Sequence, residues 1–580
     1  MVRSENMKKI ILILILLLAA LLRFYRLDSY PALNADEAAI GYNAYSLIET
    51  GKDEHGNSWP IHFQSFNDYK PGLYFYLVLP FVKVLGLNEW AVRIPGALLG
   101  VATVLVVYYL VEELFFNEKW SMVNGQWLKK SSKKLLIINH QTLAIVASFM
   151  LAISPWHIHF SRGGWETNVA TFFITCGVWL FLKSLKNAKF LVLSYSFFVA
   201  SLYTYHAARI VVPLLIMGLF LIYRKEVKKN LKEFIIAGVL GVILLIPLGL
   251  DFTKEAGYSR AGGVGLFADP GPLARVNEQR GEHGDYKGIV SILLHNKAVN
   301  YSLAFLENWG EHFSGEFLFL TGDEIQRNRV PETGQMYIID IIFIAFGLFA
   351  IFKSYTLNPK SYTLIFWWLV VAPVAAALTF QSPHALRAEN MVIPLVIISA
   401  YGLFSIIGWL RKQKRYILVI GHWSLVILIA WQFSRYLHIY YKHMAKEYSF
   451  SSQYGVKELV SYIKEEGHKY EKIVVTDAYD QPYILFLFYL KYPPEKFQGG
   501  PASPYASQGG HSLTLRDQFG FSTVESFDNY QFQKILFDQD KISYPGSLII
   551  GTDEDIPDEA NVVKEIYGTN GYKYFVIVGN

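Results

Sequence analysis

Asp36 and Glu37 stand side by side in the segment NADEAAIGYNAYSLIETG, just after the first strongly apolar stretch of the chain. Carboxylates next to hydrocarbon are costly, so they indicate either a solvated loop or a working site. Asn34 is suited to cap a helix, and acidic residues in a first turn favour the helix dipole, so capping alone would explain the pair. The other interpretation is that a carboxylate acts here as a general base.

A lysine follows in the segment FNDYKPGLYFYL, where Lys70 stands beside Tyr69 and just before a short apolar run. A lysine at this place either extends its ammonium group to lipid headgroups or binds one particular phosphate. The sequence alone leaves both interpretations open.

Two further polar segments stand at the ends of apolar stretches. SPWHIHFSRGGWETN contains Arg162 and Glu166, and QSPHALRAEN contains His384 and Arg387. Arginine is the preferred partner for a phosphate because its planar fork binds two oxygens, although an arginine at a helix end also reaches toward lipid headgroups.

No cofactor is expected. His157 and His159 are two residues apart, a poor spacing for two metal ligands on a helix. A divalent metal held by outer acidic groups is the alternative, and it is not favoured because the sequence lacks a convincing ligand cluster.

The composition indicates a polytopic membrane protein, because 52% of the 580 residues are hydrophobic and 16% are aromatic. The net charge of +5 is small for this length, and no basic tract of the nucleic-acid-binding type is present. A nucleic-acid partner is therefore not expected.

Eleven apolar segments are expected to cross the membrane, the first of them as an uncleaved helix. Their approximate bounds are 8–25, 91–115, 135–153, 168–184, 190–206, 209–223, 233–250, 336–353, 361–380, 390–410 and 416–433.

The distribution of basic residues sets the predicted orientation. The short connections at 119–134, 183–189, 224–232, 353–360 and 411–415 are rich in lysine or arginine, as cytoplasmic loops are. They alternate correctly only if the short run 72–86 lies on the outer surface as a juxtamembrane helix. The N-terminus is then cytoplasmic, the C-terminus is outside the cell membrane, and the outer loops are 28–90, 154–168, 251–335 and 381–390.

Two domains are predicted, a membrane domain of residues 1–435 and a small extracytoplasmic α/β domain of residues 436–580. The second contains a helix-like run, YGVKELVSYIKEEG, and strand-like runs such as KIVVTD, SLIIGTD and YKYFVIVGN. Segments rich in Gly and Ser separate them.

The first loop and the next span together resemble a known enzyme family. NADEAAIGYNAYSLIETG, then DYKPGLYFYLVLPFVKVLG and LNEWAVRIPGALLGVATVLVVYYLVEELF, closely resemble the GT-C membrane glycosyltransferases that use polyprenyl-phosphate sugars. These include protein O-mannosyltransferase relatives and the aminoarabinose transferases of lipid A. The similarity is strongest over residues 20–170.

The resemblance implies an enzyme that transfers a monosaccharide from a polyprenyl-phosphate donor to a protein, lipid or glycan acceptor outside the cell, with inversion at the sugar. It implies Asp36 as the base, with Glu37 beside it, and Lys70 as a ligand of the lipid phosphate. Glu166 is the candidate for a second acidic residue, although the family usually has aspartate there. We add Arg387 as a second phosphate partner, and the remaining candidates for donor binding are Tyr69, Arg162 and His384.

Two other classes remain as alternatives. A transporter or flippase of lipid-linked sugars is expected to carry ionisable residues deep within its spans, and the spans here are almost free of them. A membrane scaffold with an outer binding domain would give the first-loop Asp, Lys and aromatic residues no reason to lie together.

Overall fold

The computed structural model describes residues 2–66, 68–115, 120–123, 126–129, 140–253, 264–451, 453–499, 514–516 and 522–580. It divides into two compact units, and neither is a continuous stretch of chain. Unit 1 contains Met1–Arg23, Ala97–Ser161 and Trp165–Leu437, and unit 2 contains Phe24–Gly96, Arg162–Gly164 and His438–Asn580. The residues of the first predicted outer loop therefore pack with the C-terminal region.

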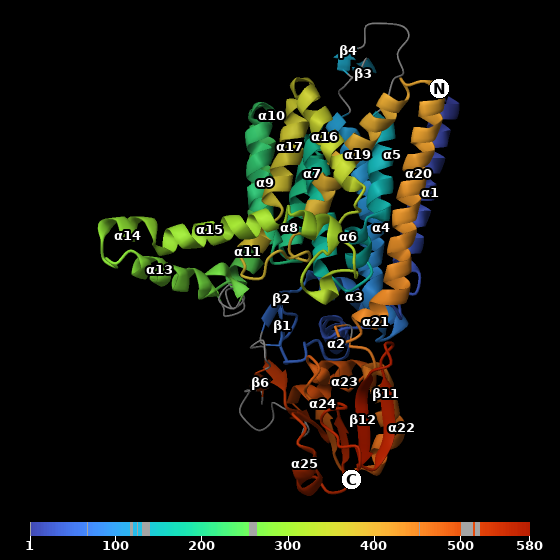
Figure 1. The fold of residues 1–580 in the computed structure, drawn as a ribbon, viewed down its shortest axis with the longest axis vertical. Coiled ribbons are helices and arrows are strands. Elements are labelled where there is room, and N and C mark those ends of the chain that lie inside the picture. The colour runs from blue at the N-terminus through green and yellow to red at the C-terminus, as the bar shows by residue number, and fades with distance from the viewer. Residues whose placement is uncertain are drawn as a thin grey trace. The chain divides into compact units, whose positions relative to one another are not determined.

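Unit 1 is a helical bundle in which the long apolar helices run side by side (Figure 1). Its helices are α1 (Val2–Phe24), α4 (Glu89–Phe115, from Ala97 onward), α5 (His140–Ile153), α6 (Pro155–Phe160), α7 (Glu166–Ser184), α8 (Phe190–Leu202), α9 (Ala208–Ile222), α10 (Arg224–Lys229), α11 (Leu231–Asp251), α13 (Gly271–Glu282), α14 (Ile289–Leu294), α15 (Lys297–Glu311), α16 (Asp340–Ser354), α17 (Pro359–Val371), α18 (Val374–Ala377), α19 (Val392–Leu410) and α20 (Arg415–His438). A hairpin of β3 (Trp120–Val123) and β4 (Gln126–Lys129) belongs to the same unit.

Small residues let the central helices of the bundle approach closely. A Cβ atom added to Gly402 of α19 would lie 1.7 Å from the carbonyl oxygen of Phe343 in α16, and one added to Gly347 would lie 2.2 Å from that of Ile398. Contacts of this kind are typical of helix packing in lipid, where association depends on close fit. The α16–α19 pair is thus a backbone-to-backbone contact.

Eight helical segments of the described residues are long and apolar enough to cross a membrane, and seven of them coincide with predicted spans. The eighth, Ile289–Leu320, falls in the predicted outer loop 251–335. The predicted segments at α5, α8 and α9 form apolar helices shorter than a full span. A helical membrane fold is confirmed, whereas the number eleven stays a prediction. Most of the Lys-rich loop 116–134 lies outside the described residues.

Unit 2 combines the elements of the first loop with a mixed β-sheet and the C-terminal helices. The first-loop elements are α2 (Ala35–Thr50), β1 (His62–Ser65), β2 (Asp68–Pro71) and α3 (Leu73–Leu85), and α3 packs on α2. The C-terminal elements are α21 (Met444–Glu447), α22 (Val456–Glu466), β5 (Ile473–Thr476), α23 (Pro482–Leu490), α24 (Pro494–Gly499), β6 (Thr514–Arg516), β7 (Ser522–Val524), β8 (Ser526–Phe527), β9 (Tyr530–Gln533), α25 (Phe537–Ser543), β10 (Leu548–Gly551), β11 (Val562–Tyr567) and β12 (Lys573–Gly579).

The six strands of the main sheet have the order β11-β12-β10-β5-β9-β8. β5 runs parallel to β10 and β9, and the remaining pairs are antiparallel. β5 and β10 are buried along their whole length, which agrees with their continuous apolar sequences. The predicted α/β character of the C-terminal region is therefore confirmed.

Candidate active site

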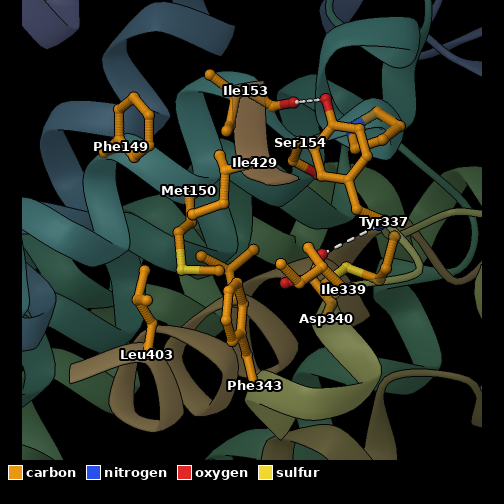
Figure 2. A pocket seen from close by; sticks show the side chains of 13 residues that line it. Phe149, Met150, Ile153, Ser154, Tyr337, Ile339, Asp340, Phe343, Leu403 and Ile429 are labelled. Carbon is orange, nitrogen blue, oxygen red and sulfur yellow. Dashed lines mark hydrogen bonds between the residues drawn. The ribbon is translucent and has the colours of Figure 1, made fainter. Parts of the chain in front are cut away.

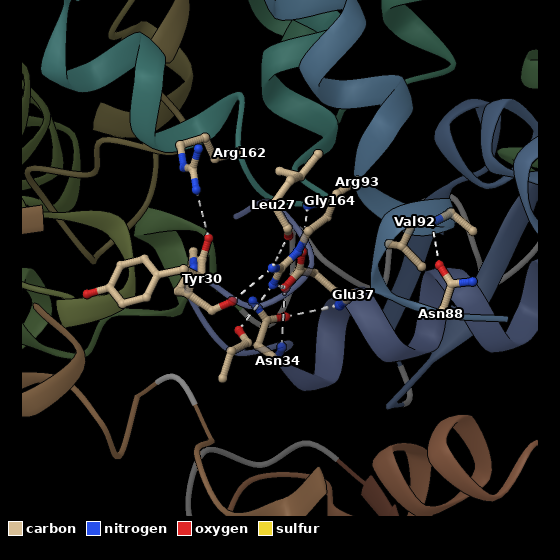
Figure 3. Close-up of polar contacts among 12 residues, drawn as sticks. Leu27, Tyr30, Asn34, Glu37, Asn88, Val92, Arg93, Arg162 and Gly164 are labelled. Atoms are coloured by element: carbon tan, nitrogen blue, oxygen red, sulfur yellow. Dashed lines mark hydrogen bonds and ion pairs between the residues drawn. The ribbon is translucent and has the colours of Figure 1, made fainter. Parts of the chain in front are cut away.

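The acidic pair begins helix α2, as the capping interpretation expects. The Asn34 side chain accepts a hydrogen bond from the Glu37 N–H at 3.0 Å, and the Glu37 carboxylate accepts one from the Asn34 N–H at 3.3 Å (Figure 3). This reciprocal arrangement is a capping box. At the other end, Gly51 ends the helix with a left-handed backbone, φ 71°.

Glu37 is a buried anchor. Its two oxygens accept hydrogen bonds at 2.6 Å from Nε and Nη2 of Arg93, and one of them also accepts the N–H of Gly164 at 2.8 Å (Figure 3). Arg93 in turn donates to the carbonyl oxygens of Leu27 and Pro31. Both charged side chains are at most 1% exposed. A carboxylate held in this way fixes the start of α2 and is not placed to take a proton from a substrate.

Asp36 has different surroundings, although it is the neighbouring residue. Its side chain is 26% exposed and forms an ion pair with Nζ of Lys70. Lys70 lies on β2, opposite Phe63 of β1, and its ammonium group also stands 5.1 Å from the centre of the Phe66 ring. The structure thus brings together the two residues that the sequence assigned to base and phosphate ligand.

Tyr69 precedes Lys70 on β2 and is paired with Gln64 of β1. Because successive side chains of a strand point to opposite faces, Tyr69 points away from the face on which Lys70 reaches Asp36. It is half-buried.

Glu54 is a buried acid near this pair that the sequence analysis did not single out. Its carboxylate accepts a hydrogen bond from the Asn43 side chain at 3.0 Å, and its N–H donates to the same side chain at 2.9 Å. Complete burial raises the pKa of Glu54 to about 8, although Asn43, the charge of Lys70 and Tyr483 act in the opposite direction. Burial also lowers the pKa of the adjacent His55 to about 4. The only sequence signal was the pattern DEHG shortly after α2.

Arg162 is held inside unit 2. Its Nη2 atom donates to the carbonyl oxygens of Tyr25 and Tyr30 at 2.7 and 3.1 Å, and its guanidinium group stacks on the rings of Tyr440 and Tyr441. Figure 3 shows the contact with Tyr30. The side chain is fully buried. This environment fits a structural clamp better than the predicted role in donor binding.

The other predicted residues belong to unit 1. Glu166 is in the first turn of α7. Arg387 donates to the Thr379 hydroxyl at 2.7 Å and to the Gln381 side chain at 3.4 Å. Nδ1 of His384 lies 3.7 Å from the carboxylate of Asp323.

Asp323 and His312 hold the loop that carries His384 and Arg387. The Asp323 carboxylate accepts the N–H of Ala385 at 2.6 Å, and the His312 ring accepts the N–H of His384 at 3.1 Å. Burial raises the pKa of Asp323, against the hydrogen bonds it accepts and the positive charge of Arg387. The backbone of the loop is therefore held at His384 and Ala385.

Among the described residues, no group of three or more His, Cys, Asp or Glu side chains is arranged to hold a metal ion. The expectation that the protein needs no metal is not tested by this observation and stays a prediction.

Unit 1 also contains an apolar crevice. Phe149, Phe343, Leu403 and Ile429 line it, from α5, α16, α19 and α20 (Figure 2). Asp340 lies on its wall and accepts hydrogen bonds from the Ser399 hydroxyl at 2.5 Å and the Tyr337 N–H at 3.0 Å. Since both oxygens of Asp340 already have partners, the crevice offers an apolar wall and no reactive group.

Comparison with known proteins agrees with this architecture. Residues 13–124 match the family model of dolichyl-phosphate-mannose-protein mannosyltransferases. The putative mannosyltransferase YkcB of Bacillus subtilis (strain 168) is 21% identical over 258 residues, which are 43% of this chain and 31% of that protein. The match thus spans less than a third of the length of that curated relative.

Two solved membrane proteins resemble the whole chain or most of it. ArnT from Cupriavidus metallidurans, solved with undecaprenyl phosphate, has a TM-score of 0.52 at 11% identity, with 97% of both chains covered. The fold is of the GT-C type. The archaeal oligosaccharyltransferase AglB from Archaeoglobus fulgidus, solved with an inhibitory peptide and a dolichol-phosphate, has a TM-score of 0.50 at 13% identity and covers 84% of this chain and 64% of that chain. The predicted resemblance to GT-C membrane enzymes is therefore confirmed.

Proposed function

We propose that this protein is a glycosyltransferase that takes a monosaccharide from a polyprenyl-phosphate donor and transfers it to an acceptor outside the cell membrane. The observation that carries the proposal is the ion pair of Asp36 and Lys70, in which a partly exposed carboxylate meets a nearly buried ammonium group. The similarity of residues 13–124 to the mannosyltransferase family supports it.

Asp36 is the proposed base. It takes the proton from an acceptor hydroxyl or amine as that group attacks C1 of the sugar. The bond between C1 and the phosphate oxygen breaks, and the polyprenyl phosphate leaves with the electron pair. One displacement inverts the configuration at C1, and a positioned base of this kind contributes about 10²–10⁴-fold to the rate.

Lys70 and Arg387 are the proposed phosphate partners. Charge accumulates on the departing phosphate, and cations held close to it lower the barrier. Without a donor, Lys70 is paired with Asp36. The phosphate of an arriving donor would draw the ammonium group away from Asp36, and the carboxylate would then be a stronger base. Glu37 supports this step by fixing the start of α2. Glu166 remains the candidate for a second acidic residue near the acceptor.

The test of the proposal is the variant Asp36→Asn, measured with purified protein and a defined polyprenyl-phosphate sugar. Asp36 is in the first turn after the Asn34 cap, and Asn keeps its shape, so the unfolding temperature should fall only slightly, by the loss of a helix-dipole interaction of about 0.3–1 kcal/mol and of a partly exposed ion pair. Transfer should fall by about 10²-fold or more, equivalent to roughly 2.7 kcal/mol in the barrier.

The neighbouring variant Glu37→Gln is the matched comparison. It breaks a buried ion pair, a change that typically costs about 3–5 kcal/mol of stability, so its unfolding temperature should drop clearly. Near-normal transfer by Asp36→Asn would mean that Asp36 only stabilises the start of α2 and is not the base. Movement of the lipid-linked sugar across the bilayer without any transfer would favour the flippase instead.

A further inference from the structure

We propose that the hairpin of helices α13, α14 and α15, here called the arm, lies on the outer leaflet of the membrane with α14 and one face of α15 immersed among the lipids. The arm projects sideways from the helical bundle, and α15 runs across the direction of the long helices (Figure 1). This inference concerns membrane contact and is independent of the transfer reaction.

The first argument is the reversed burial of α14. Of its six residues, IVSILL, the polar Ser291 is the buried one, while Ile289 is 78% exposed and Leu293 is 66% exposed. A helix in water places its apolar residues against the protein and its polar residues outside. The surroundings that suit α14 are therefore apolar.

α15 has the same reversal over four turns. At 100° per residue, Val299, Leu303 and Leu306 share one side of the helix, Asn308 lies opposite them, and Asn300 lies between the two sides. Leu303 and Leu306 are more than half exposed, whereas Asn300 is buried. The side with Leu303 and Leu306 thus faces away from the protein, with the exposed Glu307 at its edge.

Side chains near the C-terminal end of α15 attach the arm to the bundle. The Asn308 side chain donates to the carbonyl oxygens of Ala377 and Thr379 at 3.3 and 2.9 Å. The Trp309 indole donates to the carbonyl oxygen of Val370 at 2.9 Å, and the Val370 side chain is 45% exposed on the apolar helix α17. The arm is therefore attached beside an exposed apolar residue of a helical segment that is long and apolar enough to cross a membrane.

Helix α13 is the internal contrast. It buries Pro272 and Val276 and exposes Arg275 and Glu278, as a helix in water does. In this arm α13 exposes charged residues, whereas α14 and α15 expose apolar ones. This arrangement fits a boundary between water and hydrocarbon. Interfacial helices with this division typically bury their apolar face about 5–10 Å into the boundary between headgroups and acyl chains. The segment Ile289–Leu320 has the composition of a span but is bent at His295 and Asn296, so it lies along the membrane surface.

The experiment places a fluorophore on the arm of the full-length protein in liposomes of phosphatidylcholine and phosphatidylglycerol. Leu293→Cys and the control Glu278→Cys are each labelled with an environment-sensitive dye, since Cys176, the single natural cysteine, is buried. We expect the dye at 293 to emit at shorter wavelength and to be quenched by phosphatidylcholine that carries a nitroxide near the top of its acyl chain. The dye at 278 should instead be quenched by a water-soluble quencher.

Two results would overturn the proposal. Equal quenching of both dyes by the water-soluble quencher would mean that the arm stands in water. Protection of the dye at 293 from both quenchers, increasing with the ratio of protein to lipid, would mean that a second copy of the chain covers the arm. Unlabelled samples checked by thermal unfolding exclude misfolded variants from the comparison.

Discussion

At the scale of single residues, two adjacent carboxylates at the start of α2 have opposite surroundings. Glu37 is 1% exposed and held by Arg93, while Asp36 is 26% exposed and meets Lys70. Chemical type does not distinguish the two, because both are acids in a first helical turn. Burial and hydrogen bonding do, and they divide the pair into an anchor and a candidate base.

The role of Lys70 can be separated from that of an ordinary membrane-surface lysine. Lys70→Met should weaken the binding of undecaprenyl phosphate about tenfold, because a charge-assisted hydrogen bond is worth about 1.5–3 kcal/mol. Arg387→Met should act in the same direction. The measurement is the donor KM together with direct binding of undecaprenyl phosphate. Lys83→Met is the control, since Lys83 is an exposed lysine on the nearby helix α3, and an equal effect of all three changes would mean that each residue is a nonspecific anchor.

Glu54 gives a pH-dependent prediction. Burial raises its pKa to about 8 in the folded protein, against the ordinary value of 4.5. The folded state therefore holds a proton that the unfolded state has lost, and stability falls as pH rises from about 4.5 to about 8. His55 acts oppositely, since its pKa is lowered to about 4, and its contribution is lost as pH falls below 6.5.

The two residues offset each other below pH 6.5, so the window that isolates Glu54 is pH 6.5–8. Glu54→Gln imitates the protonated acid and cannot ionise in the unfolded state, so its unfolding temperature should already exceed the wild-type value at pH 6.5 and exceed it by a larger margin at pH 8. A variant that is less stable than wild type at both pH values would show that the carboxyl is held as an anion.

At the scale of elements, the bundle depends on helices that touch at glycine. The α16–α19 contact has no room for even one methyl group at Gly402. The same requirement does not apply to every glycine of a span, because around Gly238 of α11 no atom lies within 4 Å of an added Cβ. Glycine is therefore structural in one helix and replaceable in the other.

Gly402→Ala should lower the unfolding temperature in detergent, since overpacking a tight contact costs about 1–3 kcal/mol. Gly238→Ala should leave it unchanged or raise it slightly, because alanine is the better helix former by about 0.5–1 kcal/mol. Thermal unfolding of both proteins checks this, and equal unfolding temperatures would mean that α16 and α19 are not in close contact.

At the scale of the whole molecule, the chain builds each unit from separate stretches. Unit 2 takes its residues from 24–96, 162–164 and 438–580. By the predicted topology all of these lie outside the membrane or at the outer ends of spans, while the basic loops lie in the cytoplasm. The orientation is a prediction that can be tested without altering the protein's chemistry.

Single cysteines provide that test. Ser461→Cys, on the exposed side of α22, should react in intact cells with a membrane-impermeant maleimide. Lys229→Cys, at the end of α10, should react only after the membrane is permeabilised. Labelling of Lys229→Cys in intact cells would contradict the predicted inside position of the loop 224–232.

Sequence patterns were sufficient for features that depend on neighbouring residues. Short segments of the sequence predicted the Asn34 cap, the apolar runs of α4, α7 and α19, and the strands β5 and β10. The structure confirmed these predictions. The resemblance to a family assigned Asp36 and Lys70 to one site, but their pairing was not predicted, since no local pattern joins residues that far apart.

Features that depend on distant contacts could not be predicted. Arg93 meets Glu37 across 56 residues and Gly164 meets it across 127, so no local pattern indicated that Glu37 is buried. Arg162 looked like a phosphate ligand because the aromatic rings that enclose it are at 440 and 441. Residues 289–320 likewise have the length and apolarity of a span. Only the orientation of α15, across the direction of the long helices, distinguishes this segment from one (Figure 1).

The anchoring of Glu37 has a consequence for the order of synthesis. Asn34 and Glu37 leave the ribosome well before Arg93, and Arg93 leaves it well before Gly164. All four residues nevertheless contribute to one hydrogen-bond network (Figure 3). A nascent chain that ends before Gly164 therefore carries an acidic helix start whose final partner does not yet exist. Maturation of the candidate base beside it must wait until the helices on both sides of residue 164 have been translated, so the chain is expected to gain activity late in its biogenesis and not span by span.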